Sequence, residues 1–212
     1  WENDDTEMRI AAGDGLLISN HSYGLIHGFH YNSNQNRWEW HGDITISEVE
    51  DYKFGFYGSD ARQWDDIAFE NPYYLIVRSA GNDRLEGPGA GGTHYVWDNG
   101  WQSSNKVRNK DGGPDGFDCI GSGATSKNIL TVGSIDSNDM GYSMFSSKGP
   151  TFDGRIKPDV MAMGQSTYVA TTGDTASYAN ASGTSFSCPL TAGAVGLLVE
   201  GHPEWSPIEV IE

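Results

Sequence analysis

Short apolar runs alternate with helical patterns along the first third of the chain. Residues 16–18 form an apolar run between Gly15 and a polar stretch, which predicts a buried strand. After Ser59, apolar residues recur on one helical face until Asn71-Pro72, where proline disfavours the helical conformation of the residue before it. Residues 73–77 then predict a strand that is buried on both faces. This order of strand, helix and strand favours a parallel sheet covered by helices.

The second half of the chain continues the same alternation. Residues 128–135 predict a strand, and residues 185–200 predict a helix that stops at Gly201-His202-Pro203. A last helix is expected to start after Ser206, with a proline at its first position and a glutamate that completes a capping box.

Two segments lack a clear period. Residues 31–55 are polar and aromatic, and they predict a long surface excursion. Residues 83–118 are dominated by glycine, aspartate and asparagine, and they predict a loop with little regular structure.

Composition and charge narrow the function classes. The 212 residues suit one domain with a real core, and no apolar run is long enough for a membrane span. The net charge of −16 argues against nucleic acid as a partner, because phosphate binding needs clustered lysine and arginine. Cys119 and Cys188 predict two thiols rather than a disulfide framework. The chain opens at Trp1 and stops one turn into its last predicted helix, so we expect a fragment of a longer protein.

Ser185 is the first candidate for chemistry. It lies in Gly183-Thr184-Ser185 at the start of a predicted helix, where unpaired backbone N–H groups and the helix dipole favour negative charge. Small residues further along the helix allow it to be buried in the middle of a domain. A nucleophile with its own N–H as an oxyanion donor fits this position. The local pattern by itself favours a serine that only caps the helix, because capping serines are abundant.

Asn82 is the second candidate. It follows the strand at 73–77 after two small residues, at the sheet edge where parallel sheets place ligand groups. A side-chain amide there is able to donate a hydrogen bond to an oxyanion, although Gly-Asn is also common in ordinary turns.

Taken together, several ordered motifs resemble the subtilisin-like serine proteases (subtilases). They are Ser-Ala-Gly-Asn at 79–82, Gly-Thr-Ser at 183–185 with Cys-Pro at 188–189, Asn-His-Ser-Tyr-Gly at 20–24, the segment 124–133, and the segments 145–150 and 157–160. The resemblance covers residues 14–28 and 56–212, and residues 29–55 resemble an insertion. It implies an α/β fold in three layers with a mainly parallel sheet, present over residues 1–212 as a partial peptidase domain that is incomplete on its N-terminal side.

The resemblance also implies roles for individual residues. Ser185 would attack the scissile carbonyl, and Asn82 would stabilise the oxyanion together with the Ser185 N–H. The residues implied in substrate binding are Ser22, Tyr23 and Gly24, which would pair with an extended peptide; Ser79, Ala80 and Gly81, which would form a wall of the specificity pocket; and Thr184. We expect a large aromatic or aliphatic side chain to enter that pocket.

The base and the orienting carboxylate of the family are missing from this sequence. The family places an Asp in Asp-Ser/Thr-Gly and a His in His-Gly-Thr-His ahead of the serine, and neither motif occurs here. We therefore expect a serine endopeptidase fragment that is inactive alone and whose partners are a peptide substrate and the missing N-terminal half. The alternative is a non-catalytic module: a pseudoprotease that binds peptides, or a glycan binder that uses Trp38, Trp40, Trp97 and Trp101.

No cofactor or metal is assigned from the sequence. Members of the family often use calcium, but the acidic residues at 48–66 and 111–118 lack the alternating oxygen-ligand spacing of a dedicated calcium loop. Secretion or attachment to the cell envelope is what the resemblance implies for location.

Overall fold

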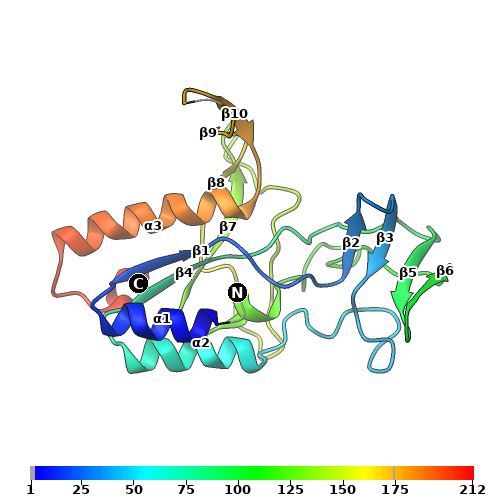
Figure 1. Cartoon of the computed structure of the whole chain (residues 1–212), viewed down its shortest axis with the longest axis horizontal. Helices are drawn as coiled ribbons and strands as arrows, with labels where there is room; N and C mark the ends of the chain where they lie inside the picture. The colour runs from blue at the N-terminus through cyan, green and yellow to red at the C-terminus, as the bar shows by residue number, and fades with distance from the viewer. Residues whose placement is uncertain (1–2, 174) are drawn as a thin grey trace.

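The computed structural model describes residues 3–173 and 175–212 as two sheets, four α-helices and a small hairpin (Figure 1). The helices are α1 (Asp4–Gly13), α2 (Ser59–Glu70), α3 (Thr184–Gly201) and α4 (Pro207–Ile211), with a 3₁₀ turn at Ser122–Thr125. The strands are β1 (Ile18–His21), β2 (Phe29–Asn32), β3 (Arg37–Trp40), β4 (Leu75–Ser79), β5 (His94–Trp97), β6 (Trp101–Ser104), β7 (Leu130–Asp136), β8 (Val160–Gln165), β9 (Thr167–Ala170) and β10 (Tyr178–Ala181).

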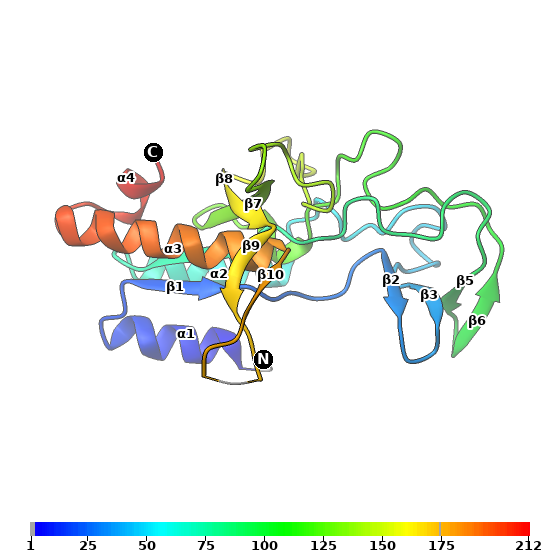
Figure 2. The ribbon, with the colours of Figure 1, turned by 90° about the horizontal axis from the view of Figure 1, so that it is seen from above.

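The main sheet is parallel and lies between two layers of helices. Its strand order is β1-β4-β7-β8, and each neighbouring pair is parallel. Helices α1 and α2 cover one face and α3 covers the other, as Figures 1 and 2 show from two directions. The α/β fold with a parallel sheet and helices on both faces is therefore confirmed.

Alternation of side chains along β4 explains why this strand is central. Tyr74 and Ile76 point into the core against α1 and α2, whereas Leu75 and Val77 pack against Cys188 and other residues of α3. Every residue of β4 is buried, as the continuous apolar run predicted.

Short strands within the two segments without a clear period pair into a second sheet that the sequence did not predict, while the rest of both segments is irregular, as expected. β2, β3, β5 and β6 pair in that order at the opposite end of the molecule from α4 (Figure 2). Each strand has four residues, and the link between the two halves is a parallel pairing of Glu39 with Tyr95 and of Trp40 with Val96. Strands this short, paired across more than fifty residues of sequence, leave little local periodicity to detect.

The four tryptophans of the alternative glycan site do not share one exposed surface. Trp40 is 1% exposed and packs with Phe29 and Val96 in the core of the second sheet, where Trp38 also packs. Trp97 is 58% exposed and contacts Trp101 edge to face. Trp40 therefore stabilises the second sheet and is not available to stack on a ligand.

Helices at the C-terminal side follow the predicted pattern with one difference. α3 begins and ends close to the predicted positions, and the capping box of Ser206 with Glu209 is present at α4. However, α3 is not enclosed: its outer face exposes Leu190 (49%), Leu197 (72%) and Leu198 (42%). Over the residues that the structure describes, no helix is both long enough and apolar enough to cross a membrane.

Both cysteines are buried free thiols, as the sequence predicted. Burial raises the pKa of Cys119 to about 12 and that of Cys188 to about 11, which keeps both thiols protonated at neutral pH. We expect iodoacetamide to modify neither cysteine in the folded protein and both after denaturation, as counted by mass spectrometry. Rapid modification of either thiol in the native state would contradict this burial.

Candidate functional site

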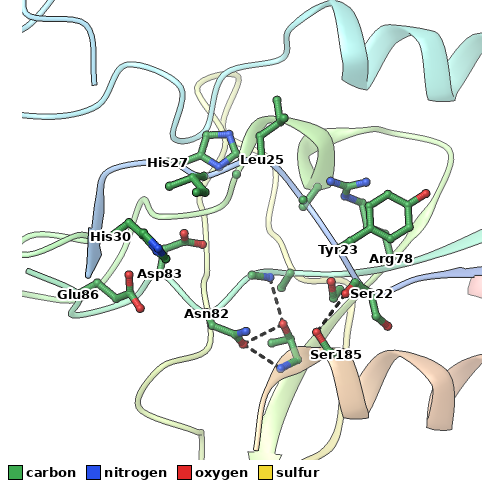
Figure 3. Close-up of a pocket in the computed structure, with 18 of the residues that line it drawn as sticks. Ser22, Tyr23, Leu25, His27, His30, Arg78, Asn82, Asp83, Glu86 and Ser185 are labelled. Carbon is green, nitrogen blue, oxygen red and sulfur yellow. Dashed lines mark hydrogen bonds between the residues drawn. The ribbon is translucent and has the colours of Figure 1, made fainter. Parts of the chain in front are cut away.

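Ser185 lies in the first turn of α3, next to the carboxyl ends of β1 and β4. Gly183, the residue before the helix, has a φ of 153°, a conformation that strongly favours glycine. The Ser185 hydroxyl donates a hydrogen bond to the carbonyl oxygen of Ser22 at 3.2 Å. The backbone turn thus presents the serine toward the segment that follows β1 (Figure 3).

Asn82 is oriented by the start of α3. Its amide oxygen accepts hydrogen bonds from the backbone N–H of Thr184 at 2.9 Å and from the Thr184 hydroxyl at 3.0 Å. Because the oxygen is held on that side, the NH₂ group is the end left to face the cavity (Figure 3). The side chain is therefore set to act as a donor, not as an acceptor, toward a ligand at Ser185.

Gly81 allows the backbone to bend between β4 and Asn82. It has a φ of 107°, and a Cβ there would lie 2.6 Å from a carboxylate oxygen of Asp83. The Gly81 N–H donates to the Thr184 hydroxyl at 3.3 Å, and its carbonyl oxygen accepts from the N–H of Ser147 at 3.0 Å. The backbone angle favours glycine here, and a larger residue would also displace the Asp83 carboxylate.

A cavity of about 210 Å³ joins these elements. All nine residues that the sequence singled out lie on its wall: Ser22, Tyr23, Gly24, Ser79, Ala80, Gly81, Asn82, Thr184 and Ser185. The structure thus brings together three segments that are far apart in sequence, and their individual roles remain predictions.

The histidines of the described residues make their hydrogen bonds away from Ser185. His21 bonds Ser19 and Tyr23, and burial, aided by Arg78, lowers its pKa to about 4. His27 lies 3.3 Å from the Ser122 hydroxyl, and burial lowers its pKa to about 4 as well. Within residues 3–173 and 175–212, no histidine or carboxylate is hydrogen-bonded to the Ser185 hydroxyl.

Sequence reasoning missed two carboxyls on the cavity wall, those of Asp83 and Glu86. Burial raises the pKa of Asp83 to about 6, and burial together with the charge of Asp83 raises the pKa of Glu86 to about 7. Asp83 directly follows Asn82, so its proximity to the site was the one available signal. Glu86 reaches the cavity only because the chain turns back after Asp83, with the Glu86 N–H bonded to the Asp83 carbonyl oxygen at 3.0 Å.

The buried acidic residues elsewhere have structural partners. Asp51 accepts from the N–H of Gly28 at 2.8 Å, and Asp65 accepts from the N–H groups of Lys127 and Asn128 at 2.7–2.9 Å. No set of three or more His, Cys, Asp or Glu side chains in the described part of the chain is arranged to hold a metal ion. These carboxylates position loops, and the assignment of no metal or calcium stays a prediction.

Comparison with protein families and curated proteins identifies relatives. A model described as "Subtilase family" matches residues 2–211. Serine protease AprX of Bacillus subtilis (strain 168) is 29% identical over 174 residues, which is 71% of this chain and 39% of AprX. The C5a peptidase of Streptococcus pyogenes is 43% identical over 74 residues, which is 33% of this chain and 6% of that protein. The chain therefore spans less than half the length of these relatives.

Solved structures share the fold at low sequence identity. The protease domain of PatA superposes with a TM-score of 0.52 at 19% identity, covering 93% of this chain and 49% of that domain. The maturation protease PagA gives a TM-score of 0.52 at 17% identity, covering 94% of this chain and 50% of that structure. At these identities the likeness concerns the fold alone.

Proposed function

Because the chain belongs to the subtilase family, we propose that it is part of a serine endopeptidase that cleaves peptide bonds through an acyl-enzyme on Ser185. The observation that carries this proposal is the placement of the Ser185 hydroxyl and the Asn82 amide on one cavity, with the amide oxygen of Asn82 already engaged by Thr184. A serine that only caps a helix needs no side-chain amide such as that of Asn82, which lies 103 residues earlier in the sequence.

The proposed chemistry uses each group for one task. The Ser185 oxygen attacks the scissile carbonyl, and its proton passes to a base. The oxyanion accepts hydrogen bonds from the Asn82 NH₂ group and from the Ser185 N–H at the positive end of α3. The amine product then leaves with the transferred proton, and water releases the acyl group from Ser185.

Residues 22–24 supply the surface for the peptide in this proposal. They continue from β1 as exposed or half-buried backbone, and β1 forms the edge of the main sheet. An extended substrate strand is able to add its main-chain hydrogen bonds to such a segment. Ser79, Ala80 and Gly81 form the facing wall, where small side chains leave room for a substrate residue.

The base and its orienting carboxylate are proposed to come from a further segment of the same protein. Two features support this proposal. β1 is an edge strand of the main sheet, with one side unpaired by another strand of the described residues, and α3 exposes three leucines on its outer face. A segment that packs there would cover this apolar surface and approach Ser185. A peptide or protein substrate and a secreted or envelope location complete the proposal.

Labelling with a fluorophosphonate tests the proposed function. We expect the full-length protein to be modified at Ser185, because a base in place makes the hydroxyl nucleophilic. Residues 1–212 expressed alone are expected to react far more slowly, since they lack that base. The measurement is peptide mapping by mass spectrometry, and a full-length protein that is not labelled would refute the serine endopeptidase.

The alternative is a pseudoprotease that binds peptides without cleaving them. The contact of the Ser185 hydroxyl with a backbone carbonyl, not with a base, is the observation in its favour. It predicts peptide binding without labelling in the full-length protein. A glycan-binding role through the four tryptophans is disfavoured, because Trp40 is buried.

A further inference from the structure

The cavity beside Ser185 has an acidic wall opposite its catalytic side. Asp83 and Glu86 come from the segment just after Asn82, and Figure 3 shows both carboxyls gathered near His30, away from Ser185. If Ser185 is the nucleophile, as the proposed function holds, the substrate residue that supplies the scissile carbonyl places its side chain in this cavity. The wall therefore bears on substrate selection.

The Glu86 carboxyl has no partner that would account for its position. Within the described residues it receives no hydrogen bond and no ion pair, although the side chain is partly buried. Its raised pKa, about 7, has burial as the main cause and the charge of Asp83 as the second. A carboxyl in this situation is stabilised by a nearby cation.

Asp83 adds a second carboxyl to this wall, whereas the nearby carboxyl of Asp111 is kept protonated by burial. Asp83 accepts a hydrogen bond from the Ser147 hydroxyl at 2.9 Å, which fixes its side chain on the wall. Asp111 is buried and accepts from the Phe29 N–H at 2.7 Å. Burial raises the pKa of Asp111 to about 9, and Asp83 and Glu86 contribute to that rise.

No lysine, arginine or histidine of the described residues forms an ion pair with Asp83 or Glu86. Arg78 lines the same cavity, but its guanidinium stacks on Trp64 at 4.2 Å from the ring centroid and lies beside Tyr23, on the far side from Glu86 (Figure 3). His27 has a pKa of about 4 and is neutral at physiological pH. His30, exposed on β2, also lines this part of the cavity and makes no ion pair with Asp83 or Glu86 among the described residues.

We propose that the cavity beside Ser185 receives a lysine or arginine side chain of the peptide substrate, with Glu86 and Asp83 as the residues that select it. The cleaved bond then follows a basic residue. A large aromatic or aliphatic side chain, which the sequence suggested, would bury these carboxyls without a partner, and that costs free energy. A cationic side chain pairs with them and uses its methylene stem along Ala80 and Gly81.

The preference for a basic residue before the cleaved bond is measured in the full-length protein with two peptide p-nitroanilides. They differ only in that one has arginine and the other leucine before the anilide. We expect kcat/KM to be about 10–100 times higher for arginine, the range for a charged pair in a partly buried site. Glu86→Gln is expected to remove most of this ratio, and Glu86→Gln with Asp83→Asn to abolish it. Glu200→Gln, the same chemical change at an exposed position of α3, is the control and is expected to keep the ratio.

Binding separates this inference from the proposed function. Fluorescence titration of the Ser185→Ala variant with the same two sequences as uncleaved peptides needs no catalysis, and we expect tighter binding of the arginine peptide that is lost with Glu86→Gln. Equal or tighter binding of the leucine peptide would overturn the basic selectivity, even in an active protease. Arginine-selective binding in a protein that fluorophosphonate does not label would uphold the selectivity and refute the peptidase.

Discussion

The Ser185→Ala variant of the full-length protein is expected to lose peptide hydrolysis by a factor of about 10⁶ in kcat, the size measured for the nucleophile of subtilisin, from which the figure is borrowed. The physical reason is that the Ser185 oxygen forms the covalent bond to the acyl group, and among the described residues no other hydroxyl donates to the Ser22 carbonyl oxygen. Initial rates with a chromogenic peptide measure the loss. The fold should be retained, because the only hydrogen bond lost from the described residues is the one to the Ser22 carbonyl.

Ser206→Ala is the matched control. The Ser206 hydroxyl belongs to the capping box of α4, remote from the cavity in sequence and in structure. Its removal is expected to lower the free energy of unfolding by about 1 kcal/mol and to leave kcat unchanged. Equal rates for Ser185→Ala and the unmodified protein would place the nucleophile elsewhere or show that the chemistry is not that of a serine peptidase.

Much of the main sheet was predictable because its signals are local. The buried strand at 73–77 appears in the sequence as a continuous apolar run, and the structure buries Leu75 and Ile76 on opposite faces. The stop at Asn71-Pro72 and the capping box at Ser206 are properties of single residues and their neighbours. Helix α1 was not predicted, since Met8 is its only buried residue and leaves hardly any apolar stripe.

The second sheet was missed because its stability comes from contacts between distant segments. Trp40 packs on Phe29 within one hairpin, but Val96 reaches the same core from beyond α2 and β4. Neither segment has an apolar period by itself. The stretch rich in glycine and asparagine therefore predicted a loop. In the structure, the parallel pairing of β3 with β5 makes part of it a strand of the second sheet.

The candidate site likewise has features that local sequence predicts and features that depend on neighbours in space. The positions of Ser185 at a helix start and of Asn82 after a strand were predictable from local pattern, whereas their roles came from the resemblance of the motifs and remain predictions. The charge of the cavity was not predictable, because Glu86 acquires its position from a turn and its raised pKa from burial and from Asp83. The protonation behaviour of a side chain depends on its neighbours in space, which a single sequence does not display.

Asn82→Ala should lower kcat by about 10²–10³ while KM changes little, the effect known for removal of one oxyanion donor in subtilisin. The NH₂ group of Asn82 is expected to donate a stronger hydrogen bond to the developing oxyanion than to the ground-state carbonyl. Its removal therefore raises the free energy of the transition state more than that of the bound substrate. Steady-state kinetics on the full-length protein provide the split between kcat and KM.

Asn82 also holds the start of α3, so a second pair of variants must separate catalysis from local structure. Asn82→Asp keeps an oxygen that accepts from the Thr184 N–H but loses the donor, and it should lose as much kcat as Asn82→Ala. Thr184→Val removes the hydroxyl that donates to the Asn82 oxygen while it keeps the backbone bond, and its kcat should fall far less. If Thr184→Val were as damaging as Asn82→Asp, Asn82 would act through the geometry of the helix start, and the oxyanion would be held by other donors.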